Sequence, residues 1–141
     1  MKLALSRAPG AERVVTPLEL FFDLVYVFAG TSSENERIHR LVETFFGVYE
    51  RGADGILVGR RESKDVPVVR EVIEELDTTL DTLVVEALRP LHPDSESVAS
   101  LRALTDLEVW RTLRDQGATP ETAVDQASGA VERWLEARPA R

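Results

Sequence analysis

The segment Asp115-Gln116-Gly117-Ala118-Thr119-Pro120 decides the fold, because it reverses the chain between the two helix-patterned halves of Val98 to Leu135. Gly117 is suited to ending a helix, since without a Cβ it readily adopts the left-handed conformation of a closing turn. Thr119 offers an N-cap oxygen, and Pro120 presets φ at the first helical position. The segment therefore predicts two helices folded back on each other.

After the turn, the apolar residues follow a single stripe, while Asp125, Glu132 and Glu136 fall on the other side of the expected helix. The stripe consists of Ala123, Val124, Ala127, Ala130, Val131, Trp134 and Leu135. This pattern predicts an amphipathic helix that buries one face.

Before the turn, the apolar residues point in two directions if the segment is one continuous helix. At about 100° per residue, Leu104 and Leu107 fall opposite Val98, Val109 and Leu113. One face of a domain cannot bury both sets. We therefore expect this helix to lie between its own domain and a second subunit, or else inside a single monomer.

A homodimer through the last two helices is the expected assembly. Alanines allow two helices to approach closely, while larger side chains supply buried area. The candidate interface residues are Leu104, Leu107, Ala123, Val124, Ala127, Val131 and Trp134. The competing interpretation is that the same stripe packs inside one subunit.

The composition bounds the class of protein. The chain has 141 residues, a formal net charge of -8, 43% hydrophobic residues and no cysteine. This length and hydrophobic content fit one globular domain with a sizeable core. The acidic balance argues against direct nucleic-acid binding, because phosphate binding needs a concentrated basic face. The lack of cysteine excludes disulfides and favours a cytoplasmic protein.

Residues 34–94 predict further helices and no strand. The expected elements are an amphipathic helix over Glu34 to Tyr49, a short weak helix at Ile56 to Val58, a long helix from Val66 to about Arg89 capped by Asp65, and the hairpin's first helix capped by Asp94 or Ser95. The predicted fold class is all-α, an antiparallel helical bundle of five to six helices.

An apolar effector pocket is the one positive hypothesis for a binding site. Six residues from three expected helices form the candidate lining: Phe45, Phe46, Tyr49, Leu76, Leu80 and Trp110. The Tyr49 hydroxyl and the Trp110 indole would supply the polar groups that orient a ligand in such a pocket. The alternative is that these side chains simply fill the core.

No catalytic constellation, metal site or cofactor motif is evident. His39 lies on a polar helix face and His92 in a loop bounded by prolines, so neither has converging ligands or a catalytic partner. Glu74, Asp77 and Asp81 share the face opposite an apolar stripe, which favours a solvated surface. The expectation is a protein that is not an enzyme and uses neither a metal nor a cofactor.

The N-terminal segment RVVTPLELFFDLVYVFA, residues 13–29, resembles the opening of the low-temperature-requirement A (LtrA) family of bacterial membrane proteins. In that family the motif begins the first of many spanning helices. No second apolar span follows in this chain, so the family's function is not carried over and a membrane partner is not expected. We treat residues 1–33 as a leader whose apolar helix, 17–29, docks on the domain or across the dimer.

Residues 34–137 resemble the C-terminal regulatory domain of the tetracycline-repressor (TetR) family. Two segments carry the resemblance: IHRLVETFFGVYER, residues 38–51, and LRALTDLEVWRTLRDQG, residues 101–117, with the Thr119-Pro120-Glu121 restart. The resemblance implies a domain that dimerises through its last two helices as a four-helix bundle and encloses an apolar effector pocket. Residues 138–141 are left as a tail.

The chain departs from that family at its N-terminus, where the helix-turn-helix DNA-binding domain would stand. Residues 1–33 contain no basic recognition helix. The resemblance thus implies a non-catalytic, ligand-responsive domain that forms homodimers, or heterodimers with an intact regulator, without binding DNA itself. Two alternatives stay open: a structural or interaction protein without a ligand, and a membrane-associated LtrA-like fragment.

Overall fold

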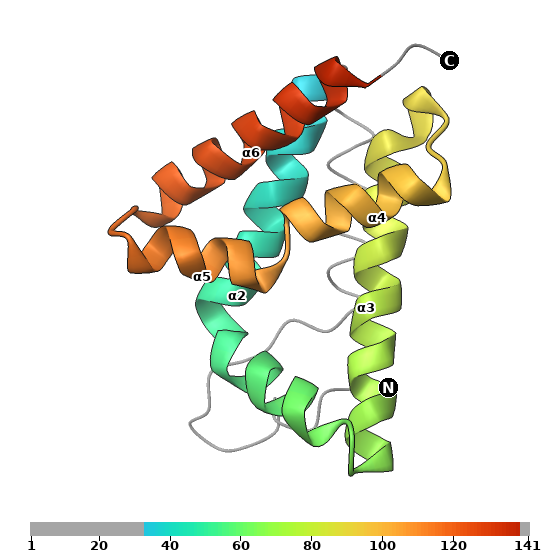
Figure 1. Cartoon of the computed structure of the whole chain (residues 1–141), viewed down its shortest axis with the longest axis vertical. Coiled ribbons are helices and arrows are strands. Elements are labelled where there is room, and N and C mark those ends of the chain that lie inside the picture. Colours follow the sequence, from blue (N-terminus) through green and yellow to red (C-terminus); the bar gives the residue numbers. More distant parts are fainter. Residues whose placement is uncertain (1–32, 139–141) are drawn as a thin grey trace.

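A computed structural model describes residues 33–138, and all regular structure in that range is helical. The elements are α2 (Glu34–Glu62), α3 (Pro67–Leu88), the short 3-10 helix η2 (Arg89–Leu91), α4 (Ser95–Leu104), α5 (Leu107–Asp115) and α6 (Pro120–Ala137) (Figure 1). The all-α class is confirmed for these residues. The predicted leader with its docked helix, and the last three residues of the tail, lie outside the described range.

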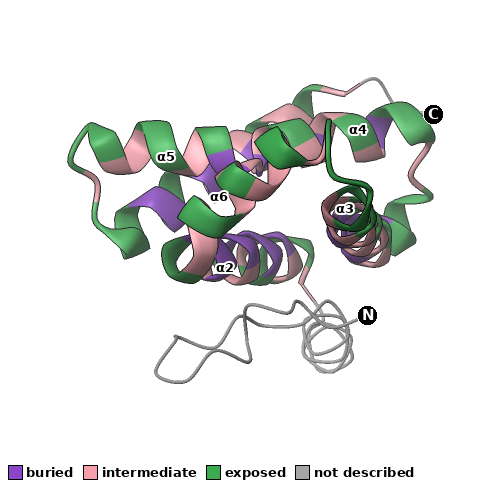
Figure 2. Cartoon of the chain, turned by 90° about the horizontal axis from the view of Figure 1, so that it is seen from below, coloured by how far each residue is buried: buried purple, intermediate pink, exposed green. Residues whose placement is uncertain are grey.

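The helices form two layers. α2 and α3 lie side by side in one layer, and α4, α5 and α6 cover them in the other (Figure 2). The core lies between the layers, where α2 packs against both α3 and α6. Its largest fully buried side chains are Ile38, Leu41, Val42, Phe45, Phe46, Tyr49, Leu80, Leu83, Leu88, Leu101 and Leu107.

Helix α2 is longer than predicted. It continues past Tyr49 to Glu62, with one non-helical residue at Gly52 (φ -138°, ψ 15°) where the helix kinks. The expected weak helix at Ile56 to Val58 is part of this continuation. The glycines in this continuation do not end the helix. At Gly59 a Cβ would lie 2.9 Å from the Ile73 Cδ1, so the glycine allows a close approach of α2 and α3.

Helix α3 matches its predicted range. Pro67 occupies the first turn, as the sequence suggests, but the N-cap residue is Val66 and makes no side-chain bond, so Asp65 is not the cap. The next start is the predicted one, since the Asp94 side chain accepts a hydrogen bond from the Ser97 N–H at 2.8 Å. The boundaries of the helices thus follow the proline and cap positions closely.

The first arm of the predicted hairpin is two helices instead of one. α4 ends at Leu104, and α5 begins at Leu107 after the Asp106 N-cap, whose side chain accepts from the Glu108 N–H. The buried Thr105 hydroxyl bonds the Leu101 carbonyl at 2.8 Å and helps to close α4. A Thr-Asp pair offers the backbone such local bonds, which compete with helix continuation.

This break removes the argument for a helix with two apolar faces. The angular positions of Leu104 and Leu107 relative to Val98 and Leu113 hold only along a continuous helix. α4 instead packs on α3 and α6, and α5 packs on α2 and α6, so both helices bury their apolar sides within one chain. A second subunit is not required to cover them.

The turn that decided the fold is confirmed in detail. Gly117 has φ +100°, and its N–H bonds the Arg114 carbonyl at 3.0 Å while the Ala118 N–H bonds the Leu113 carbonyl at 3.1 Å. This is the Schellman pattern of a glycine-ended helix. The Thr119 hydroxyl then accepts from the Thr122 N–H at 3.1 Å, which starts α6.

Candidate functional site

Five of the six predicted effector-pocket residues are core residues in the structure, and Trp110 is partly buried against the core. Leu76 is 8% exposed, and Phe45, Phe46, Tyr49 and Leu80 are at most 1% exposed. The ring centroids of Phe46 and Tyr49 are 5.9 Å apart, and those of Tyr49 and Trp110 are 6.1 Å apart. The aromatic side chains do come together, but as tilted pairs that fill space between helices.

The two polar groups proposed to orient a ligand are already occupied. The Tyr49 hydroxyl donates to the Thr105 carbonyl at 3.0 Å, and the Trp110 Nε1–H donates to a Glu50 carboxylate oxygen at 2.6 Å. Burial raises the pKa of Tyr49 far above its usual value. These two hydrogen bonds join α2 to the junction of α4 and α5 and to α5 itself.

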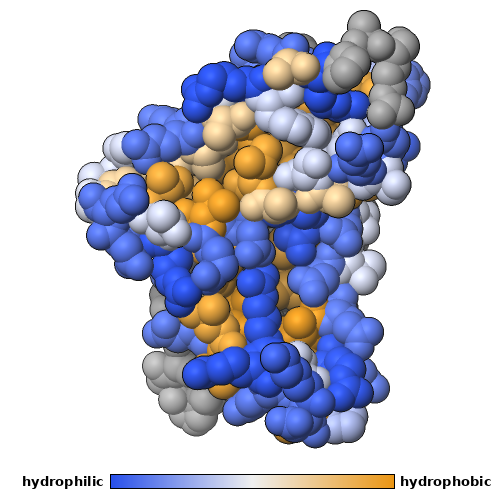
Figure 3. All heavy atoms as spheres, in the orientation of Figure 1, coloured by the Kyte–Doolittle hydropathy of each residue, from blue (hydrophilic) through white to orange (hydrophobic). Residues whose placement is uncertain are grey.

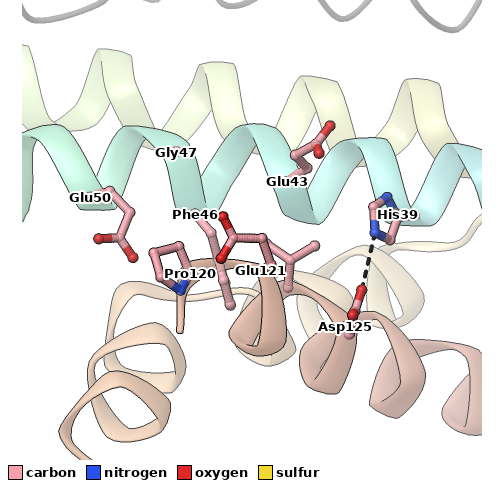
Figure 4. Close-up of a pocket in the computed structure, with 9 residues that line it drawn as sticks. His39, Glu43, Phe46, Gly47, Glu50, Pro120, Glu121 and Asp125 are labelled. Carbon is pink, nitrogen blue, oxygen red and sulfur yellow. Dashed lines mark hydrogen bonds and ion pairs between the residues drawn. The ribbon is translucent and has the colours of Figure 1, made fainter. Parts of the chain in front are cut away.

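An open groove lies beside this core, between α2 and α6. It has a volume of about 380 Å³ and is lined by His39, Glu43, Phe46, Gly47, Glu50, Pro120, Glu121, Val124 and Asp125 (Figure 4). Phe46 is the one residue that it shares with the predicted pocket. The sequence carries a signal that was missed, since residues 39, 43, 47 and 50 follow one side of a helix and include a glycine.

The groove combines apolar and acidic surface. Phe46, Gly47, Pro120 and Val124 supply the apolar part, and no lysine or arginine lines it. Four of the nine lining residues are carboxylates, Glu43 and Glu50 from α2, and Glu121 and Asp125 from α6. This arrangement makes the groove a region of negative potential above an apolar floor.

The carboxylates differ in how far they are neutralised. Glu50 is held by Arg114 at 2.9 Å, and Glu43 pairs with Arg40 at 3.2 Å. Asp125 faces the His39 Nε2 at 3.4 Å, across the groove from α6 to α2. Glu121 makes no ion pair or hydrogen bond through its side chain within residues 33–138. Glu121 is therefore the carboxylate most available to an incoming group.

The acidic face of α3 is paired. The Arg102 guanidinium bonds Asp77 at 3.2 Å and Asp81 at 2.7 Å and so ties α4 to α3. Within the described part of the chain, no three His, Asp or Glu side chains are arranged to hold a metal ion. The same residues contain no helix long and apolar enough to cross a membrane.

The predicted dimer-interface residues lie mostly inside the chain. Leu107, Ala123, Val124, Ala127 and Val131 are 0–8% exposed in the single chain, so they have almost no surface to offer a second copy. In the single chain this stripe packs against α2.

Two residues of that set retain some surface. Leu104 and Trp134 are half-buried, and the Arg138 guanidinium lies 5.3 Å from the Trp134 ring centroid. The homodimer itself stays a prediction.

Comparison with known proteins adds no family to this description. No family model matches the chain, and neither a curated protein nor a solved structure does. The function is therefore argued from the groove and the helices that form it.

Proposed function

We propose that this chain is a non-catalytic, ligand-responsive helical domain of the type that regulates TetR-like transcription factors. A small molecule occupies the groove between α2 and α6, and the domain acts through its association with a second subunit. That subunit is another copy or an intact regulator of the same kind. The net charge of -8 supports a role without direct DNA contact.

The groove is the observation that carries the proposal. Its volume of about 380 Å³ falls in the range of small-molecule sites, roughly 300–1,000 Å³. Its floor includes Phe46, which packs on Tyr49, and Tyr49 bonds the junction between α4 and α5. Phe46 itself is 1% exposed, so a ligand in the groove touches the first turn of α6 at Pro120 and lies above this part of the core.

Binding changes the domain by fixing α6 against α2. The two walls of the groove belong to helices that are far apart in sequence but in extensive contact. A ligand that touches both walls binds the folded chain and not the unfolded one, so it stabilises the fold by mass action. The half-buried Trp134 near the end of α6 is the large apolar side chain through which a second subunit would sense that change.

Thermal denaturation with a panel of small aromatic compounds, combined with light scattering, tests the proposal. We expect at least one compound to raise Tm in a concentration-dependent manner. Gly47→Leu should abolish that rise because it fills the groove, while the chain stays folded since a Cβ at Gly47 meets only Arg51 at 3.5 Å. Gln126→Leu adds the same side chain on an exposed part of α6 outside the groove lining and should leave the rise intact.

A helical interaction protein without a ligand is the second candidate. The burial of Phe45, Tyr49 and Leu80 favours it, since the aromatic stripe serves as packing. If no compound shifts Tm while light scattering detects a stable dimer, this second candidate replaces the first. A monomer that no compound stabilises would contradict both.

A further inference from the structure

We infer that the groove between α2 and α6 selects small organic cations, an ammonium or guanidinium group carried on an apolar body. This inference rests on the proposed function, because it names the chemical class of the ligand for the same site. Three features support it: the charge of the lining, its apolar floor, and a glycine in its wall that helix packing does not require.

The charge of the lining favours a cation. Glu43, Glu50, Glu121 and Asp125 border the groove, and His39 is its one residue able to carry a positive charge. An anion entering the groove meets like charges on both walls, whereas a cation meets at least one carboxylate, Glu121, that has no partner in the described range. Figure 4 shows the Glu121 carboxylate extending from α6 toward α2.

The apolar floor favours an organic ion over a metal ion. The carboxylates do not converge, and the described residues hold no group of three potential metal ligands. Gly47 and Pro120 are the apolar lining residues with surface to offer, since Phe46 is 1% exposed and Val124 8% exposed beneath them. A ligand with an apolar body covers this surface while its charged end remains at the carboxylate rim, as in other amphipathic contacts.

Gly47 is an independent sign that the groove is kept open. A glycine inside a helix is less favourable than alanine by about 1 kcal/mol. A Cβ at Gly47 would make only an ordinary contact, 3.5 Å from the Arg51 Nη1, so helix packing does not demand a glycine. What a Cβ would fill is the groove itself, since Gly47 belongs to its wall.

The N-terminus of α6, in contrast, disfavours a cation in the groove. It begins at Pro120, inside the groove, and a helix N-terminus carries partial positive charge. Glu121 lies in that first turn and offsets the dipole. The cation is therefore expected beside Glu121 with its apolar part against Gly47 and Pro120.

Binding of three matched probes to the full chain tests the inference. The probes are 2-phenylethylamine, the neutral 2-phenylethanol and the anionic 3-phenylpropanoate, each titrated at low ionic strength and followed by the backbone amide signals of a nitrogen-15-labelled sample. We expect the amine to shift the Gly47 and Val124 signals with a Kd of about 1 mM or tighter. The alcohol should bind at least about threefold more weakly, the anion should not bind, and added salt should weaken the amine.

Variants on α6 locate the charge. Glu121→Gln should weaken amine binding about threefold, the scale of one exposed ion pair. Glu136→Gln removes the same charge from an exposed position on the same helix outside the groove, and it should leave binding unchanged. Equal binding of amine and alcohol would overturn the cation selectivity and leave the groove as a ligand site. No binding of the amine at Gly47 and Val124 would also overturn the inference, even if other compounds raise Tm.

Discussion

One helix runs through two very different environments. Before Gly52, α2 buries seven residues in the two-layer bundle, whereas no residue from 53 to 75 is buried. This second region, which we call the arm, comprises the end of α2 and the first turns of α3 at the lower end of the molecule (Figure 1). In Figure 3, apolar atoms remain visible between the two helices of the arm. An apolar pattern at helical spacing is thus present on both sides of Gly52, but among the described residues of α2 only those before Gly52 are buried.

The comparison teaches that stability is uneven along one helix. Seven side chains of α2 before Gly52 are buried, while those of the arm are intermediate or exposed, so the arm removes less apolar surface from water. Regions with few buried contacts open locally before the whole chain unfolds. A side-chain ion pair joins the arm to the bundle, where Arg60 bonds Asp106 at 3.0 Å.

The largest expected difference comes from placing the same charge in the two regions. Val131 is 0% exposed in the bundle, so Val131→Asp buries an unpaired carboxylate and should abolish cooperative folding, a loss of about 4 kcal/mol or more. Val68 is 54% exposed in the arm, and Val68→Asp should lower the free energy of unfolding by at most about 1 kcal/mol. Urea denaturation followed by circular dichroism measures both. A folded, soluble monomer of Val131→Asp would instead return Val131 to a subunit interface.

A smaller loss is expected at the junction of α4 and α5. Tyr49→Phe removes the hydroxyl that donates to the Thr105 carbonyl and leaves that buried oxygen without this partner, which costs about 1–3 kcal/mol. Urea denaturation at neutral pH measures the loss. An unchanged midpoint would mean that the core around Tyr49 tolerates a substitution as well as the arm does.

The same tyrosine predicts how stability depends on alkaline pH. Burial raises the folded-state pKa of Tyr49 above its usual value of 10.0, so the unfolded chain releases this proton first. The contribution to stability is therefore complete below pH 10 and declines as pH rises above it. Urea midpoints of the natural chain should fall between about pH 9 and pH 11 more steeply than those of Tyr49→Phe.

How much the sequence could predict depended on how local each signal is. Gly117, Thr119 and Pro120 specify a turn through their own backbone chemistry, and that turn is confirmed. The break at Thr105-Asp106 was not predicted, because the apolar pattern was read as one helix through two residues that favour a helix cap.

The partner of an apolar face is a non-local property. The stripe of α6 correctly indicated burial, but nothing in its spacing distinguishes α2 of the same chain from a second subunit. The candidate groove is non-local in the same way, since Glu43 and Glu121 become neighbours only when α6 packs on α2. Sequence patterns therefore predicted the elements better than the site.

Replacing Asp106, which joins the bundle to the arm through Arg60, should have an intermediate effect on the free energy of unfolding. Asp106 both caps α5 and pairs with Arg60, so Asp106→Ala should cost about 1–2 kcal/mol. Asp106→Asn keeps a capping side chain, removes the charge and should cost about 1 kcal/mol or less. Urea denaturation ranks the two variants. Equal losses would mean that the ion pair, and not the cap, carries the contribution.

Two further measurements show what this ion pair does. Partial burial alone would raise the pKa of Asp106, but the hydrogen bond and positive charge of Arg60 lower it below its usual value of 3.8. Its contribution to stability should therefore be present above pH 3.8 and decline below it. Hydrogen exchange of residues 53–62 should accelerate in Asp106→Asn more than exchange of residues 38–49. Uniform acceleration would show that arm and bundle open together.

The smallest effect is expected where the two helices of the arm touch. Gly59→Ala gains about 1 kcal/mol of helix propensity, but its Cβ would lie 2.9 Å from the Ile73 Cδ1. That atom ends a flexible side chain in a region without buried residues, so Ile73 can move and the net change should stay within about 0.5 kcal/mol. Ile73→Val removes the Cδ1, and the double variant should be more stable than the two single changes predict by addition. If Gly59→Ala costs as much as Tyr49→Phe, the arm is packed as rigidly as the bundle, and the contrast between the two halves of α2 fails.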